Sequence, residues 1–143
     1  MNNIFQTLLY QREKQKDAVL VTIVWDDGSA PRGKGSQMLV GEDGLLSGTI
    51  GGAVELRSIQ MAQAMLGGEK IPAVKEFKLS RDGELGMACG GDVTVLFTPA
   101  YLADIGWDAL AAEVLHRVRK RVPGWLALPL DGALPRVTDE QDS

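Results

Sequence analysis

The run from Ala18 to Trp25 limits the fold of this chain more than any other segment. Nearly all of its residues are apolar, and most are β-branched. A strand with no polar face must be covered on both sides, so the run predicts a central strand buried on both faces of a sheet. We therefore expect an α/β fold, a single domain with a mixed, twisted β-sheet flanked by helices.

The spacing of apolar residues predicts the remaining elements. Helices are expected over residues 3–14, 53–66 and 107–122, and strands over 18–25, 37–40, 45–49, 73–79, 92–98 and 125–130. Pro99 is expected to stop the strand before it. We expect one domain over residues 1–130, followed by a polar, disordered tail over 131–143. His116 falls opposite the apolar stripe of its helix and is expected to face solvent.

The composition of the chain argues against several kinds of partner and binding site. A net charge of −4 with no basic face argues against a nucleic-acid partner. A single cysteine excludes an internal disulfide and a cysteine-based zinc site, and no cluster of metal ligands stands out. No apolar run approaches the ~18 residues of a membrane span, and we see no signal peptide. The cytoplasm is therefore the expected location.

Two glycine-rich segments, residues 28–36 and 48–52, follow predicted strands. The second opens a predicted helix with Gly51 and Gly52. Free N–H groups and the positive end of the helix dipole suit an anion there, and glycine lets a ligand approach the backbone. A tight strand-to-helix turn without any ligand explains the same residues equally well.

Glu55 lies in the first turn of that helix, within the sector of its apolar residues. A carboxylate facing inward needs partners, because burying it unpaired is costly. It could bond free N–H groups at the helix start. It could instead accept N–H donors from the ring of a ligand, such as a pterin or guanine edge.

Further candidates lie in the first of these segments and later in the chain. Arg32 suits phosphate contact, and Lys34 and Ser29 add donors nearby, although all three are also ordinary loop residues. Cys89 precedes Gly90 and a second glycine, whose N–H groups could lower the pKa of its thiol. A lone cysteine is more often an inert, small apolar residue.

Three motifs, in residues 28–40, 48–55 and 87–96, match in order and spacing those of a known family. The chain resembles the N-terminal type of domain in the XdhC/CoxI family. Members are described as accessory factors for molybdenum hydroxylases such as xanthine dehydrogenase and carbon monoxide dehydrogenase. They bind the molybdenum cofactor (molybdopterin), support its sulfuration and hand it to the apo-enzyme. Ala53 stands where the family usually has a third glycine, and longer members carry an additional Rossmann-like domain.

The resemblance implies a carrier or chaperone rather than an enzyme. Its cofactor-binding residues, carried over by position, are Ser29, Arg32, Gly51, Gly52, Glu55, Cys89 and Gly90. The implied partners are the large subunit of a molybdenum hydroxylase and a cysteine desulfurase. A homodimer is expected separately, because dimers with twofold symmetry are common. Two alternatives stay open at this point: a sulfur-transfer or redox protein that depends on Cys89, and a cofactor-free module that docks desulfurase to hydroxylase.

Overall fold

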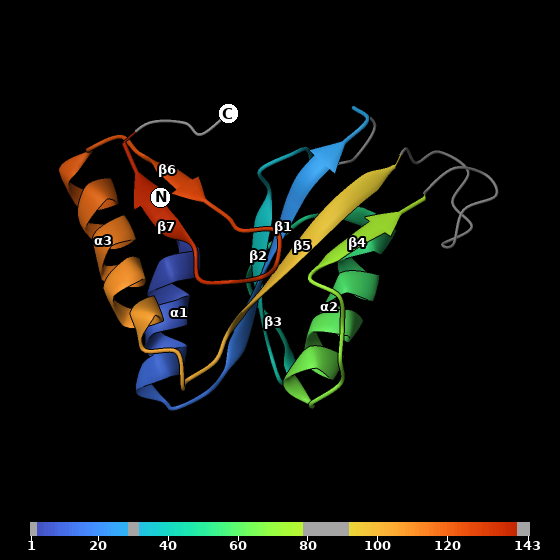
Figure 1. Cartoon of the computed structure of the whole chain (residues 1–143), viewed down its shortest axis with the longest axis horizontal. Helices are drawn as coiled ribbons and strands as arrows, with labels where there is room; N and C mark the ends of the chain where they lie inside the picture. The colour runs from blue at the N-terminus through green and yellow to red at the C-terminus, as the bar shows by residue number, and fades with distance from the viewer. Residues whose placement is uncertain (1–2, 29–31, 79–91, 140–143) are drawn as a thin grey trace.

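A five-stranded antiparallel sheet forms the centre of the computed structural model, which describes residues 3–28, 32–78 and 92–139 (Figure 1). Its strand order is β3-β2-β1-β5-β4. The strands are β1 (Ala18–Asp26), β2 (Gln37–Gly41), β3 (Gly44–Gly48), β4 (Val74–Phe77) and β5 (Val93–Ala100). The predicted α/β class is confirmed. All neighbouring strands pair antiparallel rather than in a mixed pattern.

Both faces of the sheet are covered by helices. Helix α2 (Gly52–Leu66) packs on one face, and helices α1 (Asn3–Glu13) and α3 (Gly106–Lys120) pack on the other (Figure 1). Successive side chains of β1 alternate between the two cores: Val19 and Val21 lie in the first, Leu20 in the second. The expectation that β1 is buried on both faces is confirmed. No described helix is long and apolar enough to cross a bilayer.

A second, two-stranded sheet corrects the expected tail at 131–143. Strands β6 (Trp125–Ala127) and β7 (Arg136–Thr138) pair antiparallel, and β7 contacts α3. Residues 136–138 are therefore ordered, because Val137 packs against the core beneath α1 and α3. The last four residues, 140–143, lie outside the described part of the chain.

Strand β5 also differs from the sequence prediction, since it continues through Pro99 to Ala100. The ladder between β4 and β5 ends at Leu96, whereas β1 pairs with β5 as far as Ala100. Beyond Leu96, β5 therefore has only β1 as a strand partner, and a proline can be accommodated at such an edge.

The antiparallel order brings several connections to one edge of the sheet, which we name the motif edge. It is formed by the strand ends at Asp26, Gln37, Gly48, Phe77 and Val93. The connections that carry the three sequence motifs, residues 27–36, 49–51 and 78–92, all begin and end there. The opposite edge carries only the β2–β3 turn and the segments that lead to or from helices.

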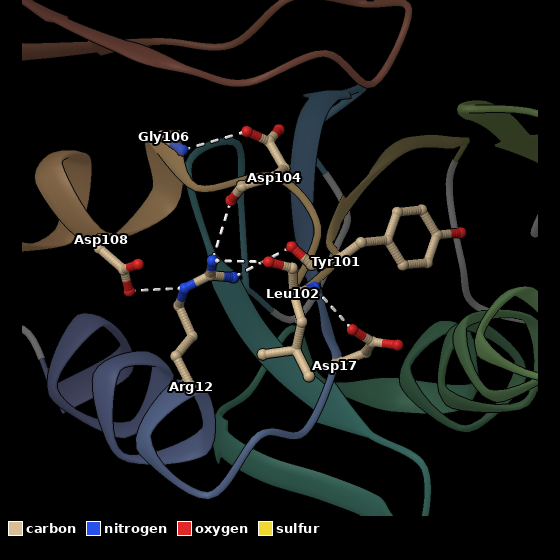
Figure 2. Close-up of polar contacts among 7 residues, drawn as sticks. All are labelled: Arg12, Asp17, Tyr101, Leu102, Asp104, Gly106 and Asp108. Atoms are coloured by element: carbon tan, nitrogen blue, oxygen red, sulfur yellow. Dashed lines mark hydrogen bonds and ion pairs between the residues drawn. The ribbon is translucent and has the colours of Figure 1, made fainter.

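Arg12 ties α1 to the loop that enters α3 (Figure 2). Its Nε donates to Asp108 Oδ1 at 2.7 Å, and its other nitrogens donate to the carbonyl oxygens of Tyr101 at 3.1 Å and Asp104 at 2.9 Å. The side chain is only 5% exposed. Asp17 holds the same loop by accepting the N–H of Leu102 at 2.7 Å. These polar contacts join α1 and the start of β1 to the segment between β5 and α3 on one face of the sheet.

Replacing Arg12 with methionine should lower the free energy of unfolding by about 2–4 kcal/mol, because it removes the ion pair with Asp108 and the hydrogen bonds that this nearly buried side chain donates to two carbonyl oxygens. Urea titration followed by circular dichroism measures the change. Lys14→Met, directly after the same helix, is the control; the Lys14 ammonium lies 4.8 Å from the centre of the Tyr10 ring at the surface, and its loss should cost less than about 1 kcal/mol. Equal losses in both variants would contradict the role given to Arg12.

Candidate functional site

The turn between β3 and α2 places three glycines in a backbone conformation that favours glycine. Gly48, Gly51 and Gly52 have φ values of +78°, +79° and +68°, in the left-handed region that L side chains rarely adopt. A Cβ atom on Gly48 would also lie 2.4 Å from the carbonyl oxygen of Gln37. The repeated glycines of this motif therefore have a direct conformational cause.

Glu55 holds this turn in shape from the first turn of α2. Its Oε1 accepts hydrogen bonds from the N–H of Ile50 at 3.0 Å and of Gly51 at 3.1 Å. The hydroxyl of Thr49 also donates to Oε1, and the N–H of Gly51 donates to the Thr49 oxygen at 3.1 Å. The helix-start interpretation of Glu55 is confirmed, while direct contact with a ligand stays a prediction.

The surroundings of Glu55 favour its charged form. Partial burial of the carboxyl group raises its pKa. The hydrogen bonds from Thr49 and from the backbone of Gly51 and Ile50 act in the opposite direction, and so does the positive charge of Arg32. These effects together outweigh burial, so the pKa of Glu55 lies below its usual value. The carboxylate is therefore ionised at neutral pH and linked electrostatically to Arg32.

Aspartates fix the other connections at the motif edge. The two carboxylate oxygens of Asp26 accept the N–H groups of Gly28 and Lys34, each at 2.7 Å, and so close the first glycine-rich loop. Asp27 and Asp92 join two connections: the Asp27 N–H donates to the Asp92 carbonyl at 3.2 Å, and the Asp92 N–H donates to Asp27 Oδ2 at 2.9 Å. Backbone positions on separate strands are thus held in fixed register.

The N-cap residue of helix α2 is Gly51, which has no side chain to bond the N–H groups of the first turn; Glu55 accepts the N–H of Gly51 itself. Such an end favours an anion through its N–H donors and its dipole. The structure brings Arg32, Gly51, Gly52 and Glu55 together at the motif edge. Ser29, Cys89 and Gly90 lie outside the described residues. Within the described residues no cluster of three metal-ligating side chains occurs.

A cavity of about 640 Å³ opens beside the motif edge, on the face of the sheet that α1 and α3 cover. Its walls come mainly from the C-terminal half of α3 and from the β6–β7 sheet, and its floor includes Thr22 and Gln37. Sequence reasoning assigned no function to these two residues. The only available signal was their position: polar side chains at or next to strands that are otherwise apolar.

The structure is a three-layer α/β domain with glycine-rich connections gathered at one sheet edge. Residues 11–77 match the family described as the XdhC and CoxI family. The molybdenum cofactor insertion chaperone PaoD of Escherichia coli (strain K12) is 37% identical over 109 residues, which make up 76% of this chain. The chain belongs to the XdhC and CoxI family, and the resemblance noted from the motifs is confirmed.

A crystal structure described as a xanthine dehydrogenase from Bacillus halodurans has the same fold, with a TM-score of 0.69 at 22% identity over 95% of this chain. Both relatives are longer than the chain. The present sequence spans 33% of PaoD and 42% of the Bacillus halodurans chain. What those proteins bind or assemble with is therefore a property of longer polypeptides.

Glu55→Gln tests the linkage at the β3–α2 turn, because it removes the charge and keeps an acceptor oxygen. The pKa of Glu55 is lower in the folded chain than its unfolded value of about 4.3, so the carboxylate stabilises the fold above that pH. This contribution is lost as the pH falls through the folded pKa. The wild type should be more stable than the variant near pH 7, with a gap that shrinks below about pH 4.3.

Urea unfolding at a series of pH values measures this gap. Glu69→Gln, which changes an exposed carboxylate beyond the other end of α2, is the matched control and should alter stability less at neutral pH. A gap between wild type and Glu55→Gln that stays constant into the acid range would contradict the assigned linkage.

Proposed function

We propose that this chain is an accessory factor that binds the molybdenum cofactor and supports its sulfuration and its insertion into a molybdenum hydroxylase. Family membership and the similarity to PaoD support an accessory role. The observation that carries the proposal is the motif edge, where the connections bearing the family motifs begin and end. Xanthine dehydrogenase and carbon monoxide dehydrogenase represent the type of client that we expect.

The donor set at the motif edge suits this cofactor, which combines a pterin, a phosphate and a dithiolene-held metal. Free N–H groups at the start of α2 suit a phosphate, and the nearby guanidinium of Arg32 adds a cation that can bind it in bidentate fashion. Gly51 and Gly52, which have positive φ angles, carry no side chain, so a ligand can approach their backbone closely.

Glu55 has a positioning role in this proposal, because its hydrogen bonds keep the turn open in the shape that presents these donors. Ser29, Cys89 and Gly90, which lie outside the described residues, complete the proposed set. The chain acts as a cytoplasmic carrier: it holds the cofactor for a hydroxylase large subunit, and a cysteine desulfurase and a second copy of the chain are further proposed partners. When bound, the cofactor supplies the oxo-transfer centre that the client enzyme uses.

Cofactor retention tests the proposal. The purified chain, mixed with molybdenum cofactor and passed through gel filtration, should elute with pterin fluorescence. Arg32→Ala should weaken retention about tenfold or more, because a charge-assisted contact to phosphate is lost. Glu55→Ala should weaken cofactor retention similarly. Three donors in the turn share one acceptor, Oε1 of Glu55, and the variant removes it.

Arg119→Ala is the matched control for charge, since it removes an exposed cation from the C-terminal turn of α3. It should retain the cofactor as the wild type does. A wild-type chain that elutes without pterin fluorescence would overturn the proposed function, and unchanged retention in both Arg32→Ala and Glu55→Ala would remove those residues from the site.

A further inference from the structure

The cavity beside the motif edge has the features of a site for a small, flat ligand. Its volume of about 640 Å³ falls within the ~300–1,000 Å³ that ligand pockets usually have. Apolar side chains line most of it, and several of them, on α3, on β6 and in the segment between these elements, are half-exposed. Val118 is 43% exposed, Val122 is 46% exposed and Trp125 is 50% exposed.

A pair of polar groups lies on the floor of this cavity. The Gln37 Nε2 donates to Thr22 Oγ1 at 3.1 Å, and Thr22 is only 3% exposed. The side-chain amide of Gln37 offers an acceptor oxygen and a second N–H next to this bond. An amide and a hydroxyl set into apolar walls favour a ring that carries both donors and acceptors along one edge.

Gln37 also connects the cavity to the β3–α2 turn. Its carbonyl oxygen accepts the N–H of Thr49 at 3.1 Å, and Thr49 in turn donates to Glu55. The cavity and the start of α2 lie toward opposite faces of the sheet, and the hydrogen bond between Gln37 and Thr49 joins them at the motif edge. Gly35, from the first glycine-rich loop, lines the cavity mouth.

The charge of the cavity walls is also favourable for an anionic ligand. Arg117 is neutralised by Glu113 at 3.3 Å and Asp139 at 2.9 Å. Arg121 lines the same cavity, and its guanidinium makes no hydrogen bond or ion pair with the described residues. One cation near the cavity thus stays available to a ligand that carries negative charge.

We propose that this cavity receives the flat ring of the bound ligand, a fused nitrogen heterocycle of the pterin type, and that Gln37 and Thr22 recognise the ring edge. The inference rests on the proposed function and adds the residues that select the ring. Val118 and Val122 contact the ring faces, while the phosphate of the same ligand reaches the start of α2. Gln37 and Thr22 are thus the specificity-determining residues of the site.

Titration with free pterin tests this inference without any client enzyme. Binding should quench the fluorescence of Trp125, and Trp125→Phe should lose that signal while calorimetry still detects binding. The double variant Thr22→Val/Gln37→Leu should bind pterin about tenfold or more weakly, because the ring edge loses its partners. Replacing both polar groups together avoids leaving one of them buried without a partner.

Val118→Phe supplies a second, independent test, because a larger side chain at this half-exposed position fills the cavity without touching the polar pair. It should abolish pterin binding. Ile105→Phe, which enlarges an apolar side chain that is 80% exposed at the other end of α3, is the control and should bind as the wild type does. Thermal unfolding of each variant confirms that it is folded.

The outcomes separate this inference from the proposed function. If the chain retains molybdenum cofactor but Val118→Phe and the double variant retain it equally well, the ring lies elsewhere and the cavity inference is overturned. If pterin binds in the cavity but the wild type does not retain the cofactor, the proposed function fails and the ring-binding cavity stands. Wild-type chain that binds no pterin at millimolar concentration also overturns the inference, and the cavity is then open to a protein partner.

Discussion

Burial of strand β1 on both faces is the constraint on which the rest of this structure depends. A strand whose first six residues are all buried requires a helical layer on each side of the sheet, and it requires strand partners at both of its edges. β2 and β5 provide those partners, both antiparallel. Antiparallel pairing on both sides of β1 places the end of that strand beside the starts of its two neighbours. The motif edge is the geometric result.

The polar groups at that edge fix the shape of both glycine-rich connections. Asp26 closes the first glycine-rich loop, and Glu55 shapes the second through the backbone of residues 50 and 51. The carbonyl of Gln37 joins that second turn to the floor of the cavity. A carrier that must bind a ligand and later release it benefits from a site whose conformation depends on a few exchangeable hydrogen bonds at a rigid sheet edge.

The sequence correctly predicted those elements whose spacing of apolar residues follows directly from which side chains are buried. The apolar run of β1 and the periodicity of the three helices needed no tertiary information. Strand β7 was missed because it is short and polar and is stabilised by pairing with β6. The course of β5 through Pro99 was missed because a proline is tolerated only where the neighbouring ladder has ended, and no sequence pattern reveals that point.

The candidate site was predictable in part for the same reasons. The glycines of the β3–α2 turn and the inward-facing Glu55 can be recognised from a short stretch of sequence alone. Val118 and Val122 fitted an ordinary core stripe, because the apolar face of a helix has the same spacing whether it packs against a core or lines a cavity. The pairing of Thr22 with Gln37 links residues on two strands, so only the sheet register could reveal it.

The central claim is that one edge of the sheet forms a single receptor, and amide chemical shifts recorded during titration with molybdenum cofactor test it most directly. The account predicts that the amides of Arg32, Gln37 and residues 49–55 shift together with one shared midpoint, along with those of Ser29, Cys89 and Gly90. Amides at the opposite edge, such as those of Gln15 and Glu69, should not move. Shifts confined to that opposite edge, or separate midpoints for the connections at the motif edge, would contradict the account.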